Sequence, residues 1–145
     1  AIPQFRETVL EYMAALTRVG HSLMAGLALS LGLEESYFAS RYTGDPLILF
    51  RIFNYPYSPR PTSADVAWGV GEHTDYGVLT ILRQDDAGGL QVRSLTKWIP
   101  PPPTPRQSLC TFGAMLGPMT RGLYPAGRSL PRRGLPPLRG RAAGR

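Results

Sequence analysis

The chain has 145 residues, the length of one domain. The net charge of +6 would suit a nucleic-acid partner, but residues 1–117 hold nine basic and ten acidic residues. Residues 118–145 hold seven arginines and no acidic residue, so the basic character belongs to this end, and a nucleic-acid partner is not expected. No apolar run approaches the ~20 residues of a membrane span. The single cysteine, Cys110, excludes an internal disulfide and favours a reducing compartment, so we expect a cytoplasmic protein.

Residues 1–43 are predicted to form a helical support region. Apolar residues recur at helical spacing along residues 2–32 and define one face. These residues are Phe5, Val9, Met13, Leu16, Leu23, Leu27 and Leu31. Gly32 is expected to end this long helix, and a second short helix is predicted near residues 34–41.

From residue 44 the pattern becomes that of strands, and we predict a β-rich core over residues 44–117. Strands are expected at 47–55, 78–83, 90–93, 97–99 and 108–112, and a helical turn within 113–120. Residues 85–89 have turn chemistry, so the strands on either side are expected to form a hairpin. A helix followed by antiparallel strands is typical of an α+β fold with a sandwich or barrel body.

Residues 118–145 differ from the rest in composition. This segment holds five glycines, five prolines and seven arginines, and it lacks Val, Ile, Phe and Trp. We predict that it is disordered, because it cannot bury enough apolar surface to offset the entropy of ordering. A weak anion-binding arm is the functional alternative.

The segment Gly71–Gly77 contains the most informative chemistry, a His-x-Asp pair at His73 and Asp75. Side chains at i and i+2 of an extended backbone point to the same side, so an imidazole nitrogen and a carboxylate oxygen could reach one metal ion. Two histidines and one carboxylate on one face of an octahedron suit ferrous iron. The pair alone is a common pattern, and a surface turn without metal is the alternative. Glu72 is assigned no role.

The sequence VGEHTDYGVLTILRQDDAGGLQVRSLTKWIPPPP resembles the core of the 2-oxoglutarate and iron-dependent dioxygenases, in their isopenicillin N synthase-like branch. The resemblance implies a double-stranded β-helix (jelly roll), here incomplete, with the long N-terminal helix packed outside it. It also implies Fe(II) as cofactor, 2-oxoglutarate as cosubstrate, and His73 and Asp75 as the first two iron ligands. Tyr55 matches a tyrosine that contacts the 2-oxoglutarate carboxylate in many members, although a packed core aromatic is an equal reading.

The resemblance weakens towards the C-terminus. The family pattern places a second histidine near Ser129 and an Arg-x-Ser pair beyond it, but the chain contains only His21 and His73. His21 lies in the predicted helix, and Arg139-Gly140-Arg141 is not Arg-x-Ser. We therefore interpret the segment beyond Tyr124 as foreign to the family, and expect poor stability, weak metal binding and little turnover.

Two functions follow from these observations. The first is Fe(II)- and 2-oxoglutarate-dependent oxidation of an unknown small molecule by O₂, impaired or lost in this chain. The second is a non-catalytic interaction or regulatory fragment of a dioxygenase. A membrane partner is not expected, and the sequence specifies neither the substrate nor the oligomeric state.

Overall fold

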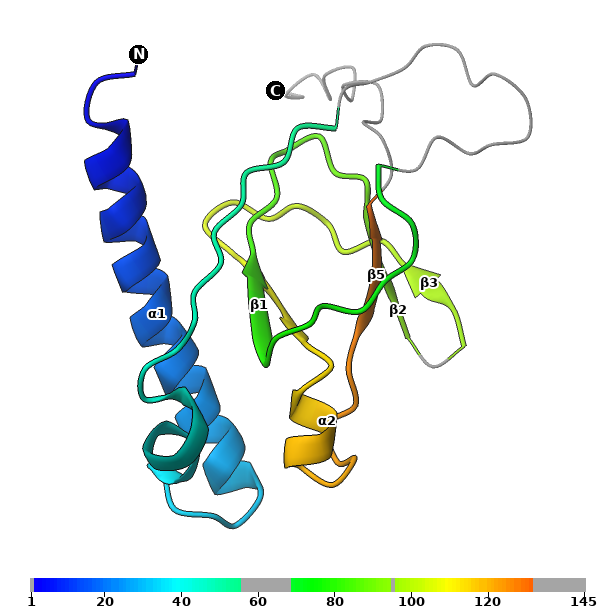
Figure 1. The fold of residues 1–145 in the computed structure, drawn as a ribbon. Coiled ribbons are helices and arrows are strands. Elements are labelled where there is room, and N and C mark those ends of the chain that lie inside the picture. The colour runs from blue at the N-terminus through cyan, green and yellow to red at the C-terminus, as the bar shows by residue number, and fades with distance from the viewer. Residues whose placement is uncertain (1, 56–68, 95, 132–145) are drawn as a thin grey trace, which may run out of the picture. The chain divides into compact units, whose positions relative to one another are not determined.

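The structure is a computed structural model that describes residues 2–55, 69–94 and 96–131 (Figure 1). The chain divides into two compact units, Ala1–Ile52 and Phe53–Arg145. The first contains the helix α1 (Phe5–Ser30) and the π-helix η1 (Ala39–Thr43). The second contains β1 (Leu79–Leu82), β2 (Leu90–Arg93), β3 (Trp98–Ile99), β4 (Leu109–Phe112), α2 (Leu116–Met119) and β5 (Arg128–Pro131). No helix among the described residues has the length and hydropathy to cross a membrane.

The helix α1 confirms the predicted long helix and its end. Gly32 has a φ of 71°, the left-handed conformation that glycine adopts without a steric penalty. The Gly32 amide donates to the Leu29 carbonyl and the Leu33 amide to the Ala28 carbonyl, both at 3.0 Å. This pair of bonds is a Schellman motif, which satisfies the last helical carbonyls and turns the chain away.

The first unit buries few side chains. Met24 and Ala28 of α1 and Phe38 are buried, and the rings of Tyr37 and Phe38 meet edge to face at 5.3 Å. The Arg41 guanidinium lies 4.4 Å from the centre of the Tyr37 ring. The short helix predicted near residues 34–41 is present, but it lies further along the chain. Its last part is the π-helix η1.

The strand predicted at residues 47–55 does not form. These residues make no ladder with any described strand, and the side chains of Leu47 and Leu49 are 90% and 73% exposed. A run that is apolar on both faces forms a strand only where neighbouring strands pair with its backbone and cover both faces. The described residues supply no such partner, so the run stays extended and exposed.

The second unit contains two small antiparallel sheets (Figure 1). In one, β1 pairs with β4, and Thr80 lies opposite Thr111. In the other, the strand order is β3-β2-β5, and Val92 lies opposite both Ile99 and Ser129. The predicted hairpin between β1 and β2 is therefore wrong. The turn at residues 85–89 instead carries the chain from the sheet of β1 and β4 into the sheet of β3, β2 and β5.

The strand β5 lies inside the segment that was predicted to be disordered. It pairs with β2 over four residue pairs, from Leu90 opposite Pro131 to Arg93 opposite Arg128. Residue 118 also lies within α2, so the described part of this segment, residues 118–131, is ordered and the prediction is wrong there. A proline is tolerated at the end of an edge strand, and the pairing overrides the weak β-propensity of the sequence. The remainder, residues 132–145, lies outside the described residues.

A tight turn after β4 holds the segment that contains Asp75. The amide of Ala114 donates to the Asp75 carbonyl at 2.7 Å, and the amide of Met115 donates to the Gly77 carbonyl at 3.2 Å. A Cβ atom on Gly113 would collide with the Gly77 carbonyl oxygen and would lie 3.1 Å from that of Asp75. Glycine at position 113 therefore permits the close approach of these two backbone segments.

We predict that Gly113→Ala destabilises the second unit by about 1–3 kcal/mol, the usual cost of overpacking a tight contact. Gly26→Ala in α1 is the matched control, because a Cβ there meets nothing within 4 Å. This control should stabilise the protein by up to about 1 kcal/mol, since alanine is the better helix former. Thermal unfolding followed by circular dichroism measures both changes. Equal melting temperatures for the two variants would contradict the packing argument.

Candidate metal centre

The structure brings the side chains of His73 and Asp75 together. The distance between His73 Nε2 and Asp75 Oδ1 is 3.6 Å, and the two side chains are 39% and 25% exposed. The imidazole and the carboxylate thus lie on one side of the backbone, as the i, i+2 spacing predicts, and both are accessible to a ligand. Their binding of a metal stays a prediction.

A backbone hydrogen bond orients the His73 ring. Its Nδ1 lies 2.9 Å from the Gly71 carbonyl oxygen. A carbonyl only accepts hydrogen bonds, so Nδ1 donates the proton and the neutral ring keeps its lone pair on Nε2. In metal-binding histidines generally, a hydrogen bond from the second ring nitrogen fixes the tautomer in the same way. The nitrogen that faces Asp75 is therefore the one able to bind a metal.

A hydroxyl group from β4 orients the Asp75 carboxylate. Thr111 Oγ1 donates to Asp75 Oδ2 at 3.0 Å, and Asp75 Oδ1 remains directed at His73. Together with the bond from the Ala114 amide to the Asp75 carbonyl, this contact fixes both the backbone and the side chain of Asp75. Sequence reasoning did not find Thr111, because it lies 36 residues further along the chain.

Ser129 lies directly beside His73. The two residues form an antiparallel bridge, in which the His73 amide donates to the Ser129 carbonyl at 3.1 Å and the Ser129 amide donates back at 3.0 Å. The Ser129 hydroxyl oxygen is 3.5 Å from His73 Nε2. The expected second histidine is thus replaced by a serine that points at the candidate ligand atom. The described residues contain no cluster of three or more His, Cys, Asp or Glu side chains that could hold a metal.

Glu72 forms a charged cluster next to this pair, although the sequence assigned it no role. Its Oε1 lies 3.4 Å from Arg93 Nη1 and 3.0 Å from Arg128 Nη1. These partners are 21 and 56 residues away, so no local pattern could indicate them. All three side chains are more than a third exposed, so each ion pair contributes little to stability. Glu72, His73, Thr74 and Arg128 line an open cavity of about 310 Å³.

Among the described residues, Tyr55 forms no hydrogen bond with His73 or Asp75. The Tyr55 ring stacks on Phe53 at 5.7 Å and lies against Gly69. Burial raises the pKa of the Tyr55 phenol above its usual value of 10.0. Its role in holding 2-oxoglutarate stays a prediction.

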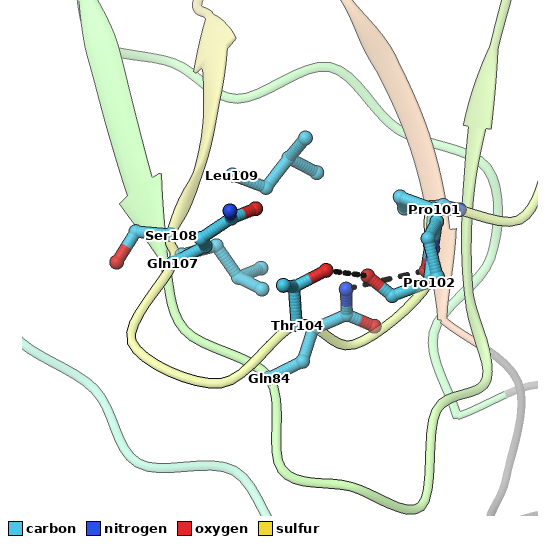
Figure 2. Close-up of a pocket in the computed structure, with 8 residues that line it drawn as sticks. Gln84, Pro101, Pro102, Thr104, Gln107, Ser108 and Leu109 are labelled. Atoms are coloured by element: carbon cyan, nitrogen blue, oxygen red, sulfur yellow. Dashed lines mark hydrogen bonds between the residues drawn. The ribbon is translucent and has the colours of Figure 1, made fainter.

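A second cavity of about 190 Å³ lies elsewhere in the same unit, between the ends of β1 and β4 and the proline-rich loop (Figure 2). Gln84 Nε2 donates to the Pro101 carbonyl at 3.5 Å, and Thr104 Oγ1 donates to the Pro102 carbonyl at 3.3 Å. The residues that line this cavity do not line the one beside His73. It is therefore separate from the candidate metal centre.

A comparison of the sequence with models of known protein families shows which family this chain belongs to. The model of the 2OG-Fe(II) oxygenase superfamily matches residues 36–140. The chain belongs to this superfamily. The match includes most of the segment beyond Tyr124, so the interpretation of that segment as foreign to the family is wrong. Fe(II) and 2-oxoglutarate, expected from the resemblance, are the cofactor and cosubstrate that the superfamily is named for.

Proteins named as oxidases and hydroxylases are among the relatives. The chain is 53% identical over 141 residues to a probable iron/ascorbate oxidoreductase of Dictyostelium discoideum, covering 89% of the chain and 38% of that protein. It is 35% identical over 150 residues to a 1-aminocyclopropane-1-carboxylate oxidase of Dictyostelium mucoroides, covering 85% and 41%. It is 38% identical over 127 residues to a homoarginine-6-hydroxylase of Glycine max, covering 84% and 38%. The chain therefore spans about two-fifths of the length of these relatives.

Solved structures confirm the fold class. The crystal structure of JOX2 in complex with 2OG, Fe and JA superposes with a TM-score of 0.77 at 29% identity, covering 90% of this chain and 38% of that one. A full-length protein of Neurospora crassa, solved in complex with alpha-KG and thymine, gives a TM-score of 0.74 at 22% identity, covering 92% and 41%, and supports the fold alone. The second unit is thus part of an oxygenase jelly roll. The packing of α1 outside that core stays a prediction.

We predict that Thr111→Val weakens divalent-metal binding by about tenfold. Valine has no hydroxyl to donate to Asp75 Oδ2, so the Asp75 carboxylate is free to rotate. Thr80→Val is the matched control. Thr80 lies opposite Thr111 on β1 and makes no hydrogen bond to Asp75, so its change should leave the affinity near that of the wild type. Anaerobic calorimetric titration with Fe(II) measures both variants. Equal losses in the two would contradict an orienting role for the Thr111 hydroxyl.

Proposed function

We propose that this chain is the iron-binding part of an Fe(II)- and 2-oxoglutarate-dependent oxygenase that oxidises a small organic molecule with O₂ in a hydroxylation-type reaction. The observation that carries the proposal is the pair His73 Nε2 and Asp75 Oδ1, 3.6 Å apart and each oriented by a hydrogen bond through its other polar atom. One nitrogen and one carboxylate oxygen are a donor set that suits Fe(II). Membership of the superfamily supports the same chemistry.

The residues of the chain take distinct roles in this proposal. His73 and Asp75 would hold the iron, which with 2-oxoglutarate would activate O₂, the oxidant, for attack on a C–H bond. The Gly71 carbonyl keeps the proton on His73 Nδ1, and Thr111 keeps the Asp75 carboxylate in place. Tyr55 would donate its phenolic proton to a 2-oxoglutarate carboxylate. The phenol of a tyrosine keeps this proton at neutral pH, and burial of Tyr55 raises its pKa further.

We propose that turnover by this chain alone is low. Two strong protein ligands hold iron less firmly than three, and Ser129 offers only a neutral hydroxyl where a histidine was expected. The relatives differ in their named activities, so they do not define one substrate. A cytoplasmic location, expected from the single cysteine, also stays a prediction.

A non-catalytic interaction or regulatory fragment is the second candidate. The exposed apolar run that includes Leu47, Leu49 and Ile52 favours it, with exposed fractions of 90%, 73% and 68%. Large contiguous apolar surface is unusual on a monomer and typical of an interaction site. Association through this run would not require iron.

The two histidines of the chain offer a direct test of the proposed function. We predict that His73→Ala lowers the affinity for Fe(II) at least about tenfold in anaerobic titration, because the ring supplies the nitrogen ligand. His21→Ala, on α1, should leave the affinity unchanged. Equal binding by both variants would refute the metal centre. If the chain then also self-associated equally with and without a chelator in size-exclusion chromatography, the interaction fragment would be favoured.

A further inference from the structure

Residues 45–51 form a segment whose backbone pairs with no other part of the chain that the structure describes. The segment belongs to neither sheet, and no described backbone group donates a hydrogen bond to it or accepts one from it. Exposure alternates along it: the side chains of Leu47 and Leu49 are 90% and 73% exposed, and those of Ile48 and Phe50 are 43% and 37% exposed. Side chains of an extended backbone alternate between two faces in this way. The segment therefore has the alternation of a strand but lacks a partner strand among the described residues.

One face of this segment lies against the chain's own helix. The Phe50 ring meets the Tyr12 ring of α1 edge to face, with 6.0 Å between the ring centres, and the segment runs beside α1 in Figure 1. The opposite face carries four exposed side chains, those of Asp45, Leu47, Leu49 and Arg51. Neither of the two charged side chains forms an ion pair with any residue in the ranges 2–55, 69–94 and 96–131. This open face thus presents two leucines between two opposite charges.

The order of these side chains makes the segment complementary to a second copy of itself. When two copies pair antiparallel about Ile48, each Asp45 lies opposite Arg51 of the other copy, and each Leu47 lies opposite Leu49. Apolar pairs then occupy the middle of the ribbon, and an ion pair lies at each end. A register centred two residues further along would set the arginine opposite a leucine and bring the two arginines to diagonal positions, where like charges repel. Charge complementarity therefore selects the first register.

Pro46 determines which edge of the segment can pair. It has no N–H group, so it fits only at a position whose backbone groups point away from the partner strand. In the pairing about Ile48, the hydrogen-bonded pairs are then Leu47 with Leu49 and Asp45 with Arg51. The other edge of each segment carries the proline, which blocks the addition of a third strand. Assembly through this segment should therefore stop at two copies.

We propose that two copies of this chain associate by antiparallel pairing of residues 45–51, and this inference rests on the second candidate function, the interaction fragment. A two-stranded ribbon alone is marginal in water and needs a covered face. A two-fold axis perpendicular to the ribbon keeps equivalent faces on the same side, so α1 of each copy covers the face that carries Phe50. The pairing supplies backbone partners, a covered face and complementary charges, and iron takes no part in it.

Exchange of charges tests the register. Arg51→Asp sets carboxylate against carboxylate at both ends of the ribbon, and Asp45→Arg sets guanidinium against guanidinium. Each variant alone should dimerise at least about tenfold more weakly than the wild type in sedimentation equilibrium at low salt. An equimolar mixture of the two variants restores both ion pairs and should dimerise like the wild type.

The matched control for this exchange is Arg6→Asp, which makes the same change of charge at an exposed position of α1 and should dimerise like the wild type. Single variants at positions 45 and 51 that dimerise as tightly as the wild type would overturn the proposal. A mixture that associates no better than its components would overturn it as well.

Substitution by proline tests the edge. Leu49→Pro removes an N–H group that faces the partner strand and should weaken dimerisation at least about tenfold, whereas Ile48→Pro removes one that faces away and should weaken it much less. Both changes replace an exposed aliphatic side chain by the same ring, so the two variants are matched. The circular dichroism of α1 checks that both are folded. Equal losses in the two variants, or no loss in Leu49→Pro, would overturn the proposal.

Failure of this inference is distinguishable from failure of either proposed function. A wild type that stays monomeric up to its solubility limit overturns the inference, while the Fe(II) titration of His73→Ala decides the metal centre independently. If the wild type dimerises but neither the charge exchange nor Leu49→Pro weakens the dimer, the interaction fragment stands and its surface lies elsewhere. The dimer should persist in the presence of a chelator, and its dissociation there would assign the association to a metal and overturn the pairing.

Discussion

The backbone bridge between His73 and Ser129 is the interaction on which the candidate metal centre depends. It joins the segment after residue 69 to β5, and β5 is itself paired with β2. Asp75 is held from the other sheet, by the Thr111 hydroxyl of β4 and the amide of Ala114. The two candidate ligands are thus adjacent in sequence but are fixed by different sheets. The pair has its geometry only when both sheets are in place.

Hydrogen bonds, and not ion pairs, determine this geometry. The imidazole Nδ1 of His73 donates to the Gly71 carbonyl, and Thr111 donates to Oδ2 of the Asp75 carboxylate. Each bond uses one polar atom of the side chain and leaves the other, His73 Nε2 or Asp75 Oδ1, directed at its neighbour. The cluster of Glu72 with Arg93 and Arg128 carries formal charge, but its exposure to solvent screens it. It links the edge of the site to β2 and β5 without approaching the strength of a buried pair. The exposed ion pairs of Glu72 therefore support a geometry of the His73 and Asp75 pair that hydrogen bonds have already fixed.

Local signals in the sequence predicted local structure well. The apolar spacing and Gly32 predicted α1 and its end, and the His-x-Asp spacing predicted that both side chains point to one side. The family resemblance was carried by residues around the same segment, and the match to the superfamily confirms it. These features depend on neighbours within a few positions, which is the range over which propensity and periodicity act.

The sequence did not predict which segments far apart in the chain pair with one another. The turn at residues 85–89 indicated a reversal but not which sheet the next strand joins, and β5 was hidden in a segment rich in Arg, Pro and Gly. The supporting roles of Thr111 and Glu72 depend on contacts over 36 and 56 residues. The apolar run after residue 47 reads as a buried strand only if another segment covers it. In each case the missing information was the identity of the partner.

Nuclear magnetic resonance of the chain with isotopically labelled histidine tests the central claim most directly. The chain has only two histidines, and Co(II) is paramagnetic, so it shifts or broadens the ring signals of a residue that binds it. Our account predicts that Co(II) perturbs the His73 ring through Nε2, while the signals of His21 stay in place. Unperturbed His73 signals at a saturating Co(II) concentration, or equal perturbation of both rings, would contradict it.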